Sequence, residues 1–500
     1  MKITRAFTVA FEGIEPRMIE VQCGLTPGNP SLSVVGLPDK AVSEAKERVR
    51  SALQALSIAL PAKRITINLS PADLPKEGSH FDLPIALSLL AALDIIPREE
   101  VASTLALGEL SLDGKLRPCV GALPAAMAAA EADCTLVCPR ESGAEAAWVG
   151  RAEVLAADSL GAIVRHYTGE VPIDAARPGE VTPPALAGDL REVKGQERAK
   201  RALEIAAAGR HHLLMVGPPG AGKSMLAARL PGIMPPMSPA EALETSMIHS
   251  LAGLLDEGGI SRQRPFRSPH HTASTAAMIG GGKGAKPGEI SLAHNGVLFL
   301  DEFPEFSRQV LETLRQPLET AEVIVARANA HARYPCRFLL VAAANPCRCG
   351  YLTEPDRACS RAPNCGEEYL GRISGPLMDR FDLRIELPPV AYEDLDLPAS
   401  GEPSPLVAAR VAEARLIQAK RHEEGTNADL QGESLERYAT PDAAGRELIS
   451  RVAEKSNLSA RGYHRVLRVA RTIADLAGSV PVTRNHVAEA FSYRLSLRGD

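Results

Sequence analysis

The stretch Leu213-Leu-Met-Val-Gly-Pro-Pro-Gly-Ala-Gly-Lys-Ser224 decides the fold of this chain. Four apolar residues of strand type lead into the pattern GxxxxGKS, and the helix-forming run Met225–Leu230 follows directly. Glycines let backbone N–H groups turn onto phosphate oxygens, and the helix presents its positive N-terminal end to them. In this context the pattern predicts an ATP site on a parallel α/β sheet, whereas the alternative is a simple glycine-rich turn. The residues expected to bind ATP are Gly217, Pro218, Pro219, Gly220, Ala221, Gly222, Lys223 (outer phosphates) and Ser224 (Mg²⁺).

Two further strand ends carry polar residues suited to ATP hydrolysis. The run Gly296-Val-Leu-Phe-Leu-Asp-Glu302 has the sequence of a strand buried on both faces, and it ends in two carboxylates. We expect Asp301 to hold Mg²⁺ through water and Glu302 to polarise the water that attacks the γ-phosphate. A third apolar strand, residues 338–345, ends in Asn345, whose amide is suited to positioning that water. The alternative role for Asn345 is that of a capping or turn residue.

An arginine precedes the last apolar strand of this region. In the segment Leu377-Met-Asp-Arg-Phe-Asp-Leu383, Arg380 stands just before the strand. A guanidinium that reaches the γ-phosphate stabilises the charge that develops there in the transition state. The alternative is a surface arginine paired with Asp379 or Asp382.

The overall composition is typical of a globular protein with several domains. The chain has 500 residues, of which 45% are apolar and 23% are charged, so we expect two to four domains. Lys and Arg number 56 against 61 Asp and Glu, and this net charge of −5 argues against a wholly basic nucleic-acid coat. No apolar run reaches the roughly 18–20 residues that span a bilayer, and no secretory signal is evident. A cytoplasmic protein that does not enter the membrane is therefore expected.

Composition and periodicity divide the chain into three blocks and a linker. Residues 1–168 mix short strands with helices, and the proline-rich residues 169–189 are typical of a linker. Residues 190–392 alternate strands with helices, as parallel α/β sheets do, and residues 393–500 have helical spacing. Specific expectations are helices over 40–56, 406–416, 444–452 and 466–476, and a strand over 64–69.

Four of the nine cysteines crowd into the loop 346–368, at Cys347, Cys349, Cys359 and Cys365. Four thiolates form the usual tetrahedral site of a structural zinc ion, with no open catalytic position. The polar loop has little to bury unless a cross-link organises it. We therefore expect structural Zn²⁺, with an iron–sulfur cluster or unliganded, redox-active cysteines as alternatives.

Two basic segments are candidates for DNA binding. Residues 262–288 contain no acid, and residues 323–337 alternate as a hairpin would, with Arg327 and Arg333 near its tip. Mobile basic loops bind backbone phosphates without reading bases, whereas the alternative is charge that is merely solvated. The basic side chains of the first segment are Arg262, Arg264, Arg267, His270, His271, Lys283 and Lys286.

Together these motifs resemble an AAA+ ATPase, and more narrowly the magnesium-chelatase-like group that includes the bacterial ComM (YifB) proteins. The narrower resemblance rests on NPCRCGY from Asn345, SPHHTAS from Ser268, LPKEGSHFDLPIA from Leu74 and LSARGYHRVLRVARTIADL from Leu458. It implies a P-loop α/β core, a carboxy-terminal helical lid, and a homo-hexameric ring whose basic insertions line the pore.

The resemblance also implies roles for single residues across a subunit interface. One subunit supplies Lys223, Ser224, Asp301, Glu302 and Asn345, and its neighbour supplies Arg380. Arg461 matches the sensor arginine of the lid, and its alternative is an ordinary arginine on a helix surface.

The amino-terminal block resembles the proteolytic domain of Lon, a fold of the ribosomal S5 domain 2 type. The resemblance rests on Pro75-Lys-Glu-Gly78 and Gly121-Ala-Leu123. The position expected for the nucleophilic serine holds His80, next to Ser79, and no lysine follows Leu123 nearby. An inactive protease domain is therefore implied, kept for structure, oligomer contact or DNA engagement.

The implied function is an ATP-driven hexameric DNA motor of the helicase type. It would promote branch migration while transforming DNA is integrated by homologous recombination, with recombination proteins as possible partners. The alternative is a magnesium-chelatase-like ATPase subunit that remodels a metal-insertion partner. The amino-terminal domain and the cysteine loop favour the first function, and the missing dyad disfavours a Lon-like peptidase.

Overall fold

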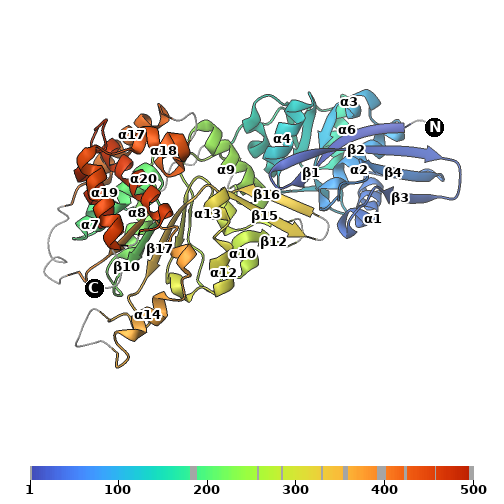
Figure 1. The fold of residues 1–500 in the computed structure, drawn as a ribbon. Helices are drawn as coiled ribbons and strands as arrows, with labels where there is room; N and C mark the ends of the chain where they lie inside the picture. The colour runs from blue at the N-terminus through green and yellow to red at the C-terminus, as the bar shows by residue number, and fades with distance from the viewer. Residues whose placement is uncertain are drawn as a thin grey trace.

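The computed structural model arranges the chain as an elongated molecule in three parts (Figure 1). The amino-terminal part, in blue, lies at one end, and the carboxy-terminal helices, in red, cover the other end. A parallel sheet lies between them. The structure describes residues 3–180, 188–255, 258–282, 285–327, 330–352, 359–390, 401–421, 425–456 and 458–494.

The central sheet has five parallel strands, as predicted for residues 190–392. In spatial order they are β11 (Phe266–Arg267), β14 (Val297–Leu300), β17 (Leu339–Ala344), β10 (Leu213–Val216) and β18 (Leu383–Glu386). Every residue of β10, β14 and β17 is buried, which explains their unbroken apolar sequences. Because parallel strands share one direction, Val216, Leu300 and Ala344 end at the same edge of the sheet.

Helices and hairpins surround this sheet. Helix α9 begins with a capping box, in which Ser238 Oγ accepts from the Glu241 N–H at 3.2 Å and the Glu241 carboxylate accepts from the Ser238 N–H at 2.9 Å. The helices are α7 (Glu197–Gly209), α8 (Lys223–Ile233), α9 (Pro239–Ala252), α10 (Thr275–Ile279), α11 (Glu289–Leu292), α12 (Arg308–Thr313), α13 (Pro317–Thr320), α14 (Asn364–Leu370) and α15 (Gly375–Met378). The antiparallel pairs are β12 (Gly280–Gly281) with β13 (Lys286–Pro287), and β15 (Glu322–Arg327) with β16 (Ala330–Pro335).

The amino-terminal part is a seven-stranded mixed sheet with helices. Its spatial order is β3 (Ser31–Val35), β4 (Arg64–Ser70), β2 (Glu15–Thr26), β1 (Ile3–Glu12), β5 (Thr104–Ala106), β8 (Thr135–Pro139) and β9 (Val154–Ala157). A short pair, β6 (Glu109–Leu110) and β7 (Leu116–Arg117), accompanies it, and the helices are α1 (Lys40–Ala55), α2 (Asp82–Ala92), α3 (Arg98–Ala102), α4 (Ala122–Glu131), α5 (Arg140–Ala146) and α6 (Leu160–Tyr167). Strand β4 and helix α1 confirm the elements predicted over 64–69 and 40–56. Helix α2 is buried along its whole length, which accounts for its apolar sequence.

The carboxy-terminal part is helical, as its spacing predicts. It consists of α17 (Ser404–Ala419), α18 (Gly432–Ala439), α19 (Ala443–Ser456), α20 (Ala460–Leu476) and α21 (Arg484–Ser492). These helices share one hydrophobic core with α7, α8 and the sheet. Within the described ranges, no helix is long and apolar enough to cross a membrane.

The amino-terminal part packs directly against the central part. Trp148 Nε1 donates to the carbonyl of Gly258 at 2.8 Å, and the Ser250 hydroxyl donates to the Glu145 carboxylate. A Cβ at Gly13 would lie 2.1 Å from the Arg333 carbonyl oxygen, so β16 approaches the β1–β2 turn closely. The predicted hairpin over 323–337 is confirmed, and it rests against the amino-terminal sheet.

Candidate nucleotide site

The phosphate loop joins β10 to α8, as the sequence predicts. Gly220 and Gly222 have φ angles of 79° and 88°, a region that side chains with a Cβ rarely adopt. Helix α8 then begins at Lys223, so its free N–H groups face the loop. This is the geometry of an anion-binding site at a helix N-terminus.

Lys223 is the buried cation of this loop, with 8% of the residue exposed. Its ammonium donates to the carbonyl oxygens of Gly217 at 2.7 Å and Pro218 at 2.9 Å, and to Asn345 Oδ1 at 3.0 Å. Burial lowers the pKa of Lys223, and the nearby charge of Asp301 opposes that shift. Asn345 follows β17, as predicted, and it touches the group expected to bind the outer phosphates.

Ser224 and Asp301 meet across the same edge of the sheet. The Ser224 hydroxyl donates to Asp301 Oδ2 at 2.7 Å. A hydroxyl and a carboxylate are the hard oxygen ligands that Mg²⁺ prefers, so this pair fits the expected magnesium site. The structure thus brings Lys223, Ser224, Asp301 and Asn345 together.

Glu302 follows Asp301 in a left-handed backbone conformation, with φ of 49°. Its N–H donates to Asp301 Oδ1 at 2.9 Å. Its carboxylate Oε2 lies 3.0 Å from Nδ1 of His271, a residue that the sequence analysis placed in the motif SPHHTAS and in the basic segment but not in the nucleotide site. The available signal was position, because His271 comes four residues after β11, the strand that pairs with β14.

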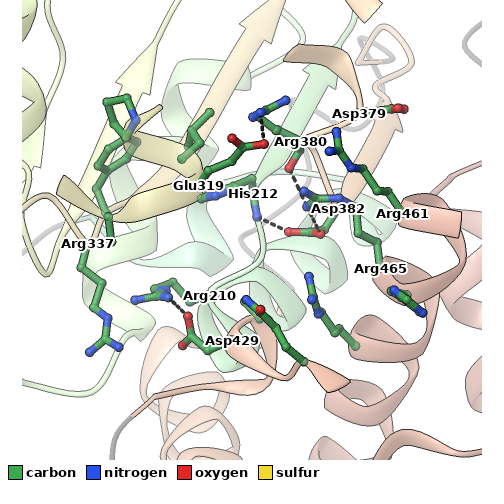
Figure 2. A pocket seen from close by; sticks show the side chains of 18 of the residues that line it. Arg210, His212, Glu319, Arg337, Asp379, Arg380, Asp382, Asp429, Arg461 and Arg465 are labelled. Carbon is green, nitrogen blue, oxygen red and sulfur yellow. Dashed lines mark hydrogen bonds and ion pairs between the residues drawn. The ribbon is translucent and has the colours of Figure 1, made fainter. Parts of the chain in front are cut away.

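Arg380 and Arg461 line a separate cavity of about 390 Å³. Figure 2 shows Arg461, from the first turn of α20, beside Arg380 and Asp379. Arg380 donates to the Glu319 carboxylate and to the carbonyl oxygens of Pro376 at 2.6 Å and Arg315 at 3.3 Å. The alternative pairing of Arg380 with Asp379 or Asp382 is therefore wrong in this structure.

Asp382 instead ties this cavity to the carboxy-terminal helices. Its Oδ1 accepts from Arg465 of α20 at 2.6 Å, and its Oδ2 accepts from the His212 N–H at 3.1 Å. Burial alone would raise the pKa of Asp382, but Arg465 and the neighbouring histidines hold it well below its usual range. Arg465 also donates to the Arg380 carbonyl at 3.0 Å, so α20 fixes the backbone on which Arg380 stands.

The cavity and the phosphate loop lie at opposite ends of the parallel strands: the cavity at their amino-terminal ends and the loop at their carboxyl ends. Arg380 precedes β18, whereas the phosphate loop follows β10, and these two strands are parallel neighbours. The residues lining the cavity include none from the phosphate loop. Within one chain, Arg380 and Arg461 are therefore not brought to Lys223.

The basic segment 262–288 is only partly free to bind a partner. Arg264 pairs with Glu241 at 3.3 Å, and Arg267 forms a bidentate pair with Glu289 at 2.7 Å. Arg262 and Lys286 are exposed. Lys283 and the side chain of Arg327 lie outside the described residues.

The cysteine loop contains four free thiols that contact one another. Cys347 Sγ lies 3.0 Å from Cys349 Sγ, and Cys359 and Cys365 also share hydrogen bonds with this group. A hydrogen bond from Cys347 lowers the pKa of Cys349 to about 7. The 3.0 Å spacing is shorter than the separation of about 3.8 Å that tetrahedral Zn²⁺ imposes on two thiolates. Across the described ranges, no group of three or more His, Cys, Asp or Glu side chains is arranged to hold a metal.

The residues around the position of the Lon nucleophile form hydrogen bonds with other groups. The Ser79 hydroxyl donates to the Glu109 carboxylate, the Lys76 ammonium donates to the Pro71 carbonyl, and His80 Nε2 lies 2.9 Å from the Val9 carbonyl. None of these contacts is a Ser–Lys pair. The Lon resemblance of this part stays a prediction, as does its lack of peptidase activity.

Comparison with known proteins gives three family matches along the chain. They are described as magnesium chelatase, subunit ChlI, over residues 189–395; subunit ChlI of Mg-chelatase, over residues 19–142; and the ChlI C-terminal part, over residues 401–494.

Individual relatives fall into two groups. The competence protein ComM of Haemophilus influenzae is 43% identical, with 100% of this chain and 98% of that protein aligned. YifB of Salmonella typhimurium is 42% identical, with 99% and 97% aligned. The magnesium-chelatase 38 kDa subunit of Rhodobacter capsulatus is 24% identical, with 61% of this chain and 86% of that subunit aligned.

Proposed function

This chain belongs to the magnesium-chelatase-like family that includes the ComM and YifB proteins, and from that premise we propose that it is an ATP-driven DNA motor. The motor is a homo-hexamer of the helicase type that promotes branch migration while transforming DNA is integrated by homologous recombination. The observation that carries the ATPase activity is the convergence of Lys223, Ser224, Asp301, Glu302 and Asn345. The name of the Haemophilus relative, a competence protein aligned over the whole chain, supports the role in transformation.

In ATP hydrolysis a water oxygen bonds to the γ-phosphorus, and the bond between that phosphorus and the oxygen of the leaving ADP breaks. The attacking water also loses a proton, which must be accepted. Glu302 accepts that proton, and Asn345 orients the water. Lys223 neutralises charge on the outer phosphates. Mg²⁺, which Ser224 and Asp301 would hold, supplies further neutralisation when bound.

Arg380 acts on the nucleotide of a neighbouring copy, and Arg461 is the sensor arginine of the lid. Its position supports this role, because Arg380 precedes β18 and lies at the end of the sheet opposite the phosphate loop of its own chain. Arg380 exchanges Glu319 for the neighbour's γ-phosphate. The arginine excess of the cavity supports a phosphate partner, since four acids (Glu319, Asp379, Asp382, Asp429) face six arginines (Arg210, Arg337, Arg380, Arg461, Arg465, Arg468).

DNA binds through the two basic segments 262–288 and 323–337. In the first segment, the exposed Arg262 and Lys286 contact backbone phosphates, while Arg264 and Arg267 keep their internal ion pairs. In the second segment, Arg333 is exposed beside the amino-terminal sheet. Contacts of this kind are strongly dependent on salt and carry little sequence preference.

The cysteine loop carries structural Zn²⁺ in this proposal. Its support is chemical, because Cys347, Cys349, Cys359 and Cys365 already contact one another and are the ligands that zinc prefers. Zinc binding requires Cys347 and Cys349 to move apart from their 3.0 Å contact. The loop lies against the phosphate loop, since a Cβ at Gly350 would come within 2.8 Å of Pro219.

The second candidate is a metal-insertion ATPase subunit, favoured by the three chelatase-subunit matches. Coverage argues against it, because the chelatase subunit aligns with 61% of this chain and ComM aligns with all of it.

Steady-state ATPase measurements with and without DNA distinguish the two candidates. We expect single-stranded or forked DNA to stimulate hydrolysis several-fold at low salt, and the Lys223→Ala variant to be inactive in both conditions. Sedimentation with ATP should show a hexamer. A parent protein whose ATPase rate does not respond to either DNA would refute the DNA motor and leave the chelatase-like role.

A further inference from the structure

A second, smaller cavity lies between the central sheet and the carboxy-terminal helices, and arginines surround it. Its volume is about 80 Å³. The arginines that line it come from the segments before β10, β11 and β17 and from α17, and they are Arg210, Arg264, Arg337 and Arg415. Because buried like charges repel one another, such a cluster is stable only with anions beside it.

Two carboxylates lie beside these four cations, and each is paired with one arginine. Arg264 Nη2 lies 3.3 Å from Glu241 Oε2, and the Arg210 guanidinium donates to the Asp429 carboxylate. Burial alone would raise the pKa of both carboxyls, but the neighbouring arginines hold it below its ordinary value. Both acids are therefore ionised at pH 7, and each balances one of the four cations.

Arg337 and Arg415 have no carboxylate partner of this kind in the described part of the chain. Arg415 donates to the Ala207 carbonyl at 3.2 and 2.8 Å, whereas the Arg337 guanidinium donates to no described residue. Burial, together with the nearby charges of Arg264 and Arg210, lowers the pKa of Arg415 to about 9, so this side chain is still charged at pH 7. The cavity therefore has two positive charges that the chain does not balance.

The size and the shape of the cavity fit a tetrahedral oxyanion. One buried water needs about 10–15 Å³ of such volume, so 80 Å³ holds a small oxyanion but not a nucleotide. Planar guanidinium groups that converge from several elements match the oxygen atoms of phosphate, with two hydrogen bonds from each group. A dianion also supplies the two negative charges that the cluster lacks.

We propose that this cavity binds inorganic phosphate at a site distinct from the ATP site. The anion fastens the helical part to the sheet, because Arg415 belongs to α17 whereas Arg210 and Arg337 precede sheet strands. These last two arginines also line the larger cavity that contains Arg380, and Figure 2 shows Arg337 running away from Arg380. Bound phosphate thus also fixes two side chains of that larger cavity. The site does not depend on the proposed motor.

Equilibrium dialysis of the full chain with radiolabelled inorganic phosphate, without nucleotide and at fixed ionic strength, tests this site. Arg337→Gln and Arg415→Gln should each weaken binding about tenfold or more, because each removes hydrogen bonds to a charged group. Arg446→Gln is the matched control, since this exposed arginine of α19 lies outside the cavity, and it should bind phosphate like the parent.

Thermal unfolding gives a second measurement, in which the sign of the effect changes with phosphate. Without phosphate, Arg337→Gln should unfold at the same temperature as the parent or higher, because it removes a repelling charge and no internal hydrogen bond. Phosphate should raise the unfolding temperature of the parent and of Arg446→Gln, but not that of Arg337→Gln.

Two further variants separate this site from the other phosphate sites of the chain. Lys223→Ala and Arg380→Ala should both retain one bound phosphate per chain. Loss of that phosphate in either variant would assign it to the phosphate loop or to the larger cavity, and binding by Arg337→Gln and Arg415→Gln equal to the parent would also overturn the site. Displacement by a single-stranded oligonucleotide would assign the arginines to nucleic acid and overturn the assignment to inorganic phosphate. None of these measurements requires ATP hydrolysis or stimulation by DNA, so failure of the motor and failure of this site are distinguishable.

Discussion

Replacing Lys223 with alanine tests the phosphate site most directly. The ammonium makes three hydrogen bonds, at 2.7, 2.9 and 3.0 Å, and 8% of the residue is exposed. It is therefore a nearly desolvated cation, and an incoming phosphate replaces neutral acceptors with charged ones. The carbonyl groups of Gly217 and Pro218 keep the side chain aimed at the loop before nucleotide arrives.

The expected loss of affinity follows from the bonds that the ammonium can form. A hydrogen bond to a charged group contributes about 1.5–3 kcal/mol, and two such bonds to the outer phosphates contribute about 3–6 kcal/mol. Each 1.4 kcal/mol is a factor of ten, so Lys223→Ala should weaken ATP binding about 10²–10⁴-fold.

Equilibrium binding of a fluorescent ATP analogue measures this loss, with thermal unfolding as the check on folding. Glu302→Gln is the matched control, because it keeps the shape of a side chain in the same site and removes only its charge. This variant should bind the ATP analogue as tightly as the parent. An affinity of Lys223→Ala within about fivefold of the parent, in a folded protein, would refute the role of the ammonium.

Three further predictions concern the neighbouring groups. Arg380→Ala and Glu302→Gln should each abolish hydrolysis, and mixing the two proteins should recover part of it, because each defect lies on a different side of the proposed interface; no recovery in co-assembled rings would contradict action between copies. Elemental analysis of protein purified without chelator should find one zinc per chain, lost in Cys359→Ser/Cys365→Ser, whereas metal well below one equivalent with free thiols would contradict the zinc proposal. Asp382→Asn should reduce the free energy of unfolding at pH 7 by about 3–5 kcal/mol, since it breaks a buried ion pair. Because the folded pKa of Asp382 is depressed, its contribution is present above the unfolded pKa of about 3.9 and is lost as the pH falls through the folded pKa, so denaturant titrations of parent and variant should converge in acid and stay apart at pH 7.

Sequence reasoning succeeded where one strand end determines a position. Asp301 and Asn345 each follow a buried apolar strand, and parallel strands place their ends at one edge. The phosphate loop fixes that edge, so the contacts among Lys223, Ser224 and these two residues followed from topology.

Sequence reasoning failed where a partner depends on how loops and helices pack. Arg380 pairs with Glu319, 61 residues earlier, and not with an acid beside it in the sequence. His271 was assigned by its charge to a DNA segment, but the length of the turn after β11 brings it to Glu302. Neither the Arg380–Glu319 pair nor the His271–Glu302 contact is encoded by periodicity or spacing, because each depends on tertiary contacts between separate elements.

The geometry of the sheet also gives a reason for assembly. A single chain presents Glu302 at the carboxyl ends of the strands and Arg380 before the amino-terminal end of β18, so the two side chains lie at opposite ends of the sheet. Arg380 is meanwhile 6% exposed and neutralised by Glu319, so the isolated copy avoids an unpaired buried cation. Hydrolysis in the proposed motor therefore requires an exchange, in which a neighbour's phosphate takes Arg380 from Glu319. This exchange replaces an internal carboxylate partner with a phosphate partner, which couples ATP hydrolysis to ring assembly.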